Sequence, residues 1–228
     1  MEFVGIDKFS LLDYEDKISC VLFCKPCNFR CPFCHNGLTV LEADTFIPFD
    51  DILDYLKSRK GLLDAVVVSG GEPTLMPDLK EKIVKLKELG FLIKLDTNGT
   101  NPEAIKDLYE SHLIDYVAMD IKNSESMYSA TAGVKSIPMD KIKQSIHYLM
   151  TSGIDFEFRT TLIDEYHDIK SIKEMGELIK GSKKLYLQKF VERDSCIKKG
   201  LHEVSEEKAK EFIKILEPYI DKVILRGY

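Results

Sequence analysis

The segment Ile18–Phe23 (ISCVLF), followed closely by Cys27–Cys34 (CNFRCPFC), decides the fold of this chain. The first stretch is an apolar run of the kind that forms a buried strand. The second carries three cysteines spaced C-x3-C-x2-C, with an aromatic residue before the last. Three thiolates on one loop can hold three irons of a [4Fe–4S] cluster, because cysteine sulfur ligates such clusters. A fourth protein ligand is not evident, so the spacing predicts an open iron that binds another molecule.

The remaining cysteines are Cys20, Cys24 and Cys196. Five of the six cysteines lie within 15 residues, which is too clustered for a disulfide framework and favours metal or redox chemistry. Cys20 lies among apolar residues and is expected to be a small buried side chain. Cys24 either ligates the cluster or merely lines the loop. The second alternative is favoured because the cluster needs its open iron, and no role is predicted for Cys196.

Apolar runs alternate with amphipathic stretches along nearly the whole chain. Strands are predicted at 18–24, 64–69, 91–96, 116–121, 155–162 and 184–190. Helices are predicted near 49–59, 77–89, 102–111, 138–152, 168–181 and 205–217, and a short apolar run, 223–225, follows. Repeated strand–helix units with continuous apolar strands predict an α/β fold, in which helices cover a parallel sheet. Six such units favour an open, partial (β/α)6 barrel.

The length of 228 residues suits one sizeable domain with a real core. We expect a single core domain over 1–228, with a cluster loop at 24–36 and a C-terminal helix and short strand at 205–226. The net charge of −6 gives no reason to expect nucleic-acid binding. Nothing in Met1–Asp7 resembles a signal peptide, and no apolar stretch reaches the roughly 20 residues that span a bilayer. A cytoplasmic protein without a membrane partner is therefore predicted.

In parallel α/β folds, reactive groups gather at the C-terminal ends of the strands, and unusual polar residues of this chain lie there. Gly70, Gly71 and Glu72 follow the second predicted strand. Glycine lets a backbone approach a ligand closely, and the carboxylate could accept a bond from a ligand ammonium group. A plain strand-to-helix turn explains this segment equally well. The third strand ends at Asp96, a carboxylate that needs a partner if it is buried, with Asn98 two residues later in a turn.

The last three strands of the predicted barrel carry polar side chains too. Asp120 and Lys122 share one face where the fourth strand ends, as a structural ion pair or as part of a site. Arg159 in the fifth strand suits a carboxylate or a ribose hydroxyl. Gln188 places an amide in the apolar sixth strand. Polar groups at six consecutive strand ends indicate one shared site.

Taken together, these residues resemble the radical S-adenosylmethionine (SAM) superfamily, whose signature is a C-x3-C-x2-C loop after the first strand. The resemblance covers essentially the whole chain. It implies that Cys27, Cys31 and Cys34 hold a [4Fe–4S] cluster, whose open iron is chelated by the amino and carboxylate groups of SAM. The cofactor-binding residues that it implies are Phe33, Gly70, Gly71, Glu72, Asp96, Asn98, Asp120, Lys122, Arg159 and Gln188.

Within that set, the resemblance places the segment 70–72 against the methionine amino group and Phe33 against adenine. The remaining residues would complete the pocket for the ribose, the carboxylate or a bound cation. A monovalent cation near Asp96 and Asp120 is a further cofactor that it implies.

Shorter motifs narrow the resemblance to the activating proteins of anaerobic ribonucleoside-triphosphate reductase, which belong to the glycyl-radical-enzyme activases. The motifs are Ser10–Tyr14 (SLLDY), Cys34–Asn36 (CHN), Lys94–Gly99 (KLDTNG), Ala118–Lys122 (AMDIK), Glu157–Thr161 (EFRTT) and Leu187–Phe190 (LQKF).

This narrower resemblance implies that one electron from a reduced flavodoxin or ferredoxin drives cleavage of SAM to methionine and a 5′-deoxyadenosyl radical. The radical removes the Cα hydrogen of a glycine in a partner protein, the glycyl radical enzyme. Several activases insert a ferredoxin-like domain with further cysteines. None is expected here, because 37–63 holds no cysteine.

Other functions stay open. The target could be another glycyl radical enzyme of the pyruvate formate-lyase type, or a small molecule or RNA. A structural zinc site could use Cys24 with the three cysteines of the motif, or His35 as a substitute ligand. Of the other histidines, His112, His147 and His167 are expected to be solvated, and His202 lies in a late loop where a partner could dock.

Overall fold

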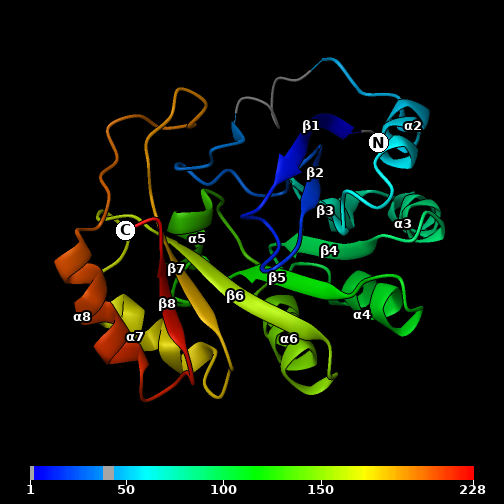
Figure 1. Cartoon of the computed structure of the whole chain (residues 1–228). Helices are drawn as coiled ribbons and strands as arrows, with labels where there is room; N and C mark the ends of the chain where they lie inside the picture. The colour runs from blue at the N-terminus through cyan, green and yellow to red at the C-terminus, as the bar shows by residue number, and fades with distance from the viewer. Residues whose placement is uncertain (1–2, 38–43) are drawn as a thin grey trace.

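One eight-stranded sheet runs through the protein in a computed structural model that describes residues 3–37 and 44–228. The strands lie side by side in sequence order (Figure 1). They are β1 (Phe3–Ser10), β2 (Ser19–Cys24), β3 (Ala65–Gly70), β4 (Leu92–Thr97), β5 (Tyr116–Asp120), β6 (Asp155–Leu162), β7 (Leu185–Lys189) and β8 (Val223–Arg226). The β1–β2 pair is antiparallel, and every later pair is parallel. The sheet is curved (Figure 1), and because β1 and β8 lie at opposite ends of the strand order without pairing, the barrel is open.

Helices cover the outer face of the curved sheet (Figure 1). They are α2 (Phe49–Ser58), α3 (Leu79–Glu88), α4 (Pro102–Glu110), α5 (Tyr128–Ala132), α6 (Met139–Thr151), α7 (Ile169–Leu178) and α8 (Glu206–Leu216), with a 3-10 turn, η1 (Pro73–Leu75), after β3.

The two faces of β3 show how the sequence builds the core. Val66 and Val68 belong to the large apolar cluster that the helices cover, whereas Ala65 and Val67 belong to a smaller one with Val21. All four β3 side chains are fully buried. Alternate residues of a strand point to opposite faces, so a continuous apolar run suits a sheet that is buried on both sides.

The predicted fold class is confirmed, since each of the six predicted strands is a strand of the parallel part of the sheet. The run 223–225 lies in β8, which adds one more parallel strand. The prediction missed β1 and α5. In β1, Gly5 and the charged pair Asp7–Lys8 interrupt the apolar pattern, and Asp7, Lys8 and Phe9 are exposed. The five residues of α5 are too few to show a helical period.

The predicted segment 205–226 contains α8 and β8. The assignment of 1–228 to a single domain without an inserted ferredoxin-like domain stays a prediction, and residues 38–43 lie outside the described part of the chain. None of the helices in the described residues is both long and apolar enough to cross a bilayer.

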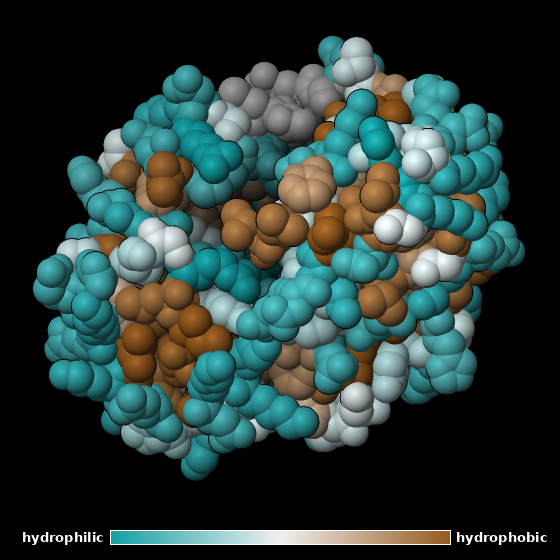
Figure 2. All heavy atoms as spheres, viewed as in Figure 1, coloured by the Kyte–Doolittle hydropathy of each residue, from teal (hydrophilic) through white to brown (hydrophobic). Residues whose placement is uncertain are grey.

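Figure 2 shows that hydrophilic side chains cover most of one face, with apolar side chains gathered near its centre. Among the large apolar side chains that the chain exposes are Phe9 (58%), Leu11 (60%) and Leu12 (83%), at the end of β1 and in the turn after it. Exposed apolar groups in one short segment are typical of a surface that meets another molecule.

Candidate active site

A cavity of about 500 Å3 lies where the parallel strands end. Every predicted site residue except Glu72 lines it: Cys27, Cys31, Phe33, Cys34, Gly70, Gly71, Asp96, Asn98, Asp120, Lys122, Arg159 and Gln188. These residues come from β3 to β7 and from the loop after β2, so the topology brings distant segments of sequence to one place. This size suits a small-molecule or cofactor site.

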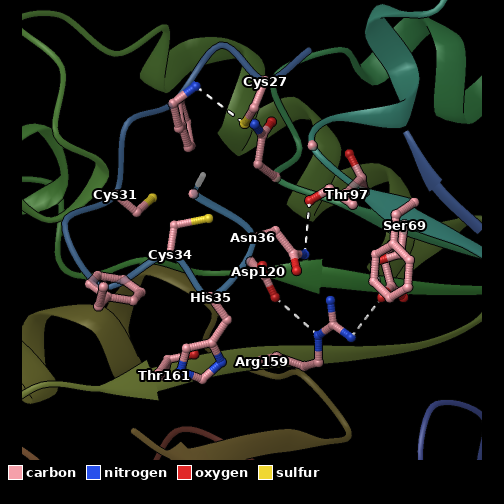
Figure 3. Close-up of a pocket in the computed structure, with 18 of the residues that line it drawn as sticks. Cys27, Cys31, Cys34, His35, Asn36, Ser69, Thr97, Asp120, Arg159 and Thr161 are labelled. Carbon is pink, nitrogen blue, oxygen red and sulfur yellow. Dashed lines mark hydrogen bonds and ion pairs between the residues drawn. The ribbon is translucent and has the colours of Figure 1, made fainter. Parts of the chain in front are cut away.

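Cys27, Cys31 and Cys34 lie on one tight loop, and Figure 3 shows their sulfurs around a common space. The Cys34 N–H donates to the Cys31 carbonyl oxygen at 3.0 Å, and the Phe29 N–H donates to Cys27 Sγ at 3.3 Å. All six cysteines are free. The loop therefore presents three thiols to the cavity without any disulfide.

Burial raises the pKa of Cys27 to about 12 and that of Cys31 to about 11, and it also raises the pKa of Cys34. Lys122 opposes the shift at all three cysteines, because its positive charge favours the thiolate. The bare thiols are thus protonated at neutral pH. A metal that binds them must displace these protons, as metal ions bound by thiolate do.

The zinc alternative needs three or four ligands around one ion. Within the described residues, no group of three or more His, Cys, Asp or Glu side chains is arranged to hold a single metal ion. Cys24, which that alternative uses, is fully buried at the end of β2 and does not line the cavity. A multi-iron cluster differs from zinc because each thiolate binds a different iron, so the sulfurs need not converge on one point.

The glycines after β3 allow two backbones to touch. A Cβ at Gly70 would lie 2.4 Å from the backbone nitrogen of Cys24, and one at Gly71 would lie 2.4 Å from the carbonyl oxygen of Pro26. Gly70 also has φ +105, which disfavours other residues. The Gly71 N–H donates to the Cys24 carbonyl oxygen at 2.8 Å. These glycines hold β3 against the start of the cysteine loop, in addition to lining the cavity.

Glu72 is the predicted site residue that the structure turns away from the cavity. Its carboxylate accepts bonds from Thr74 N (3.1 Å), Thr74 Oγ1 (2.6 Å), Thr97 Oγ1 (2.8 Å) and Asn98 N (2.6 Å). Burial raises its pKa, and these four donors lower it. Glu72 thereby ties the end of β3 to the end of β4.

The hydrogen bonds that begin at Glu72 continue through Asn98 to the cysteine loop. Asn98 Nδ2 donates to Asn28 Oδ1 at 2.7 Å, and Asn28 Nδ2 donates to Thr100 Oγ1 at 2.9 Å. Asn28 directly follows Cys27. The residues after β4 therefore position the first cysteine of the motif.

Four charged side chains form a connected group in the cavity wall, and Figure 3 shows the contact between two of them, Asp120 and Arg159. Arg159 reaches Asp96 Oδ2 through Nη1 at 3.1 Å and Asp120 Oδ1 through Nε at 3.0 Å. Lys122 Nζ lies 2.8 Å from Asp120 Oδ2. Burial raises the pKa of Asp120, but Lys122 and Arg159 outweigh it and lower the value to about 2. Asp120 is therefore ionised throughout the physiological range.

One oxygen in this group lacks a partner. Asp96 Oδ2 accepts from Ser69 Oγ at 2.9 Å and binds Arg159, whereas Asp96 Oδ1 is buried without a hydrogen bond. A buried polar atom without a partner is costly, so this oxygen is ready to accept a bond from a ligand or to bind a cation.

The prediction that His167 is solvated is wrong. This side chain is fully buried, whereas His112 and His147 are exposed as predicted. Its Nδ1 accepts from the Ile163 N–H at 3.0 Å, and Nε2 lies 3.1 Å from the Lys122 carbonyl oxygen. Burial lowers its pKa, so the ring is neutral and supports the segment that carries Lys122. His202 is exposed and pairs with Glu165 at 2.7 Å.

Several cavity residues were absent from the predicted site: Asp7, Asp13, Phe23, Ser69, Thr97, Thr161, Arg193 and Ile197 among others. Thr161 could have been found, because it shares the face of β6 with Arg159 by alternation. Arg193 and Ile197 lie in the irregular connection after β7, where no period predicts which side chains turn inward.

Comparison with known proteins adds three findings. The sequence profile described as "Radical SAM superfamily" matches residues 21–179. A protein of Methanocaldococcus jannaschii, named provisionally as a glycyl-radical enzyme activating enzyme, is 35% identical over 97% of this chain and 94% of its own length. The pyruvate formate-lyase-activating enzyme of Staphylococcus aureus is 32% identical over 46% of this chain and 47% of its own length.

Among solved structures, SuiB of Streptococcus suis bound to S-adenosylmethionine is similar in fold. The TM-score is 0.67 at 16% identity, over 91% of this chain and 52% of SuiB. At that identity the likeness concerns the fold alone.

Proposed function

The chain belongs to the radical SAM superfamily and is an enzyme of the glycyl-radical-enzyme activating type, and on that premise we propose that it installs a glycyl radical in a partner protein. The observation that carries the proposal is the cavity in which three loop cysteines meet the polar ends of β3 to β7. The partner proposed first is anaerobic ribonucleoside-triphosphate reductase, from the shorter motifs such as Ser10–Tyr14 and Lys94–Gly99.

The cysteines fit the cluster that the family implies. Cys27, Cys31 and Cys34 are free thiols on one wall of the cavity and are not arranged to hold a single ion. We propose that they hold one [4Fe–4S] cluster, with SAM beside it. The cluster and SAM, when bound, supply a radical that abstracts hydrogen after one-electron reduction, while the protein binds, orients and shields them.

The charged wall suits the amino-acid end of SAM. Lys122 and Arg159 offer cationic groups to a carboxylate, and Asp96 Oδ1 is free to accept a bond. The two cations, Lys122 and Arg159, balance the carboxylates of Asp96 and Asp120. A zwitterionic group, which has no net charge, can bind there without disturbing this balance. Gly70 and Gly71 face the cavity through backbone alone. We propose Phe33, Asn98, Asp120 and Gln188 for the remaining contacts with SAM.

Glu72 enters this proposal in a changed role, because its carboxylate is committed to Thr74, Thr97 and Asn98. It would hold Thr97 and Asn98, which line the cavity, in place without contacting SAM itself. A monovalent cation near Asp96 and Asp120 would have to use Asp96 Oδ1, because Arg159 and Lys122 occupy the other carboxylate oxygens that the group offers.

A protein substrate agrees with the rim of the cavity. Asp7 and Asp13 line it, and the exposed Phe9, Leu11 and Leu12 belong to the same segment. Charged and apolar side chains together offer a partner loop both kinds of contact. A reduced flavodoxin or ferredoxin is proposed as the electron donor. The alternatives are a glycyl radical enzyme of the pyruvate formate-lyase type, a small molecule or RNA.

Anaerobic reconstitution with iron and sulfide tests the proposed cofactor site. The protein should bind roughly four irons per chain and, with dithionite, convert SAM to 5′-deoxyadenosine. Cys27→Ala should lose both the brown colour and the cleavage. Cys20→Ala is the matched control, because Cys20 lies on β2 away from the cavity and should keep both. If Cys27→Ala retained a full complement of iron, the proposed ligand set would be wrong.

A further inference from the structure

Three exposed basic residues lie in the cysteine loop or in segments whose backbone contacts it. Arg30 lies in the loop itself, and its backbone N–H donates to the Ala132 carbonyl oxygen at 2.9 Å. Lys135 follows three residues later in that neighbouring segment. Lys198 comes from the connection after β7, and its N–H donates to the Pro32 carbonyl oxygen at 2.8 Å. All three side chains are exposed, and we call this set the basic face.

The basic face carries uncompensated charge. Throughout residues 3–37 and 44–228, no carboxylate lies within salt-bridge distance of Arg30, Lys135 or Lys198. Of the acids in the connection that carries Lys198, Asp194 lies 3.6 Å from Lys199, and Glu192 accepts from Gly200 N at 2.6 Å. The whole chain is acidic, at −6, so this positive surface is a local exception. Such a patch attracts acidic partners.

The basic face is also the outer side of the wall that bears the cysteines. Arg30 Nη1 donates to the carbonyl oxygens of Cys27 and Phe29, both at 2.7 Å. Arg30 directly precedes Cys31, and Pro32, which binds Lys198, directly follows it. Arg30 is exposed, whereas its neighbour Cys31 lines the cavity, so the loop has its basic side chain outside and its thiols inside.

We propose that the basic face is the docking surface for an acidic one-electron donor protein. This inference rests on the proposed function, which requires that an electron reach the site from outside. The donor loses one electron and the cluster held by the loop gains it, without transfer of any atom. Charge complementarity favours an acidic protein, and docking on this face brings the donor against the loop that bears the cysteines. Electrostatic docking of this kind weakens as salt screens the charges.

The test measures binding of oxidised flavodoxin, chosen with a negative net charge, by isothermal titration calorimetry. The double variant Lys135→Glu/Lys198→Glu should bind flavodoxin about tenfold more weakly at low salt, and the difference from the wild type should shrink at high salt. Both lysines are exposed and neither side chain makes a hydrogen bond in the described structure, so folding should be retained.

The matched control is Lys173→Glu/Lys214→Glu, which makes the same change in net charge on exposed positions of α7 and α8. The control should bind flavodoxin as the wild type does, apart from a small effect of net charge. If both double variants lose affinity equally, the docking surface is not the basic face. Tight binding by Lys135→Glu/Lys198→Glu would likewise overturn the proposal.

A second readout separates this inference from the proposed function. SAM cleavage driven by dithionite needs no docking protein, so both double variants should match the wild type. Cleavage driven by reduced flavodoxin should fall only in Lys135→Glu/Lys198→Glu. If dithionite drives no cleavage in the wild type, the proposed function fails, whereas the binding measurement still decides on the docking surface.

Discussion

Asp120 is the residue on which the charge balance of the cavity depends. It is the carboxylate that Lys122 and Arg159 share, and Arg159 in turn links it to Asp96. Removing one member of such a group leaves buried charges without partners, which costs more than the pair itself contributes. The four side chains therefore act as a unit, and substituting any one of them changes the charge balance of the other three.

The lowered pKa of Asp120 predicts how stability depends on pH. Because the folded-state pKa of about 2 lies below the unfolded value of about 3.9, the ionised carboxylate stabilises the fold above about pH 4. This contribution, on the order of 2 kcal/mol, is lost as the pH falls towards 2. Urea unfolding of the wild type and Asp120→Asn should show a difference at pH 7 that narrows at pH 3. An equal difference at both pH values would contradict this assignment.

At the scale of the element, the contact between the end of β3 and the cysteine loop positions the site. The Gly71 and Glu72 N–H groups donate to the carbonyl oxygens of Cys24 and Pro26, at 2.8 and 2.9 Å. Backbone bonds of this kind require that nothing larger than hydrogen occupy the Cα of Gly71.

Gly71→Ala should disturb the loop, since its Cβ would lie 2.4 Å from the Pro26 carbonyl oxygen and 2.8 Å from its carbon. We expect a loss of about 1–3 kcal/mol in the free energy of unfolding and a lower iron content after reconstitution. Gly5→Ala is the matched control, because the nearest atom to its Cβ would be the Phe23 ring at an ordinary 3.4 Å. Chemical denaturation and iron analysis of both variants measure the effect. Full iron content in Gly71→Ala would refute the positioning role.

The apolar patterns of the strands and helices explain why most of these elements could be predicted from the sequence. The parallel strands are rich in apolar residues, from the continuous run of β3 to the alternating pattern of β6, and most of the helices show a clear apolar face. β1 escaped prediction because it is an edge strand whose exposed residues need no apolar pattern. Tertiary pairing with β2, which no local pattern encodes, makes it a strand.

At the scale of the whole molecule, the rule that polar groups collect at strand ends correctly led to one cavity, and the predicted residues make up about half of its lining. It failed at Glu72, because the direction of that side chain depends on Thr97 and Asn98 from the next strand. It could not find Arg193 or Ile197, which reach the cavity from an irregular connection. Burial of His167 beneath Lys122 was equally invisible, since it follows from how the segment after β6 packs against the segment after β5.

The whole molecule also bears on the substrate of the proposed function. The chain spans 94% of its Methanocaldococcus jannaschii relative, and in the segment Asp7–Asp13 both acids line the cavity while Phe9, Leu11 and Leu12 are exposed. A partner loop could contact this segment, which agrees with the proposed target, a glycine on that loop.

Electron paramagnetic resonance of the reconstituted enzyme tests the central claim most directly. The enzyme is mixed anaerobically with SAM, a reductant and anaerobic ribonucleoside-triphosphate reductase or, in parallel, pyruvate formate-lyase. We predict a glycyl-radical doublet in one of these partners, and no signal with Cys27→Ala. If 5′-deoxyadenosine forms but no candidate glycyl radical enzyme ever acquires the doublet, the proposed activity is contradicted, and the small-molecule and RNA alternatives take its place.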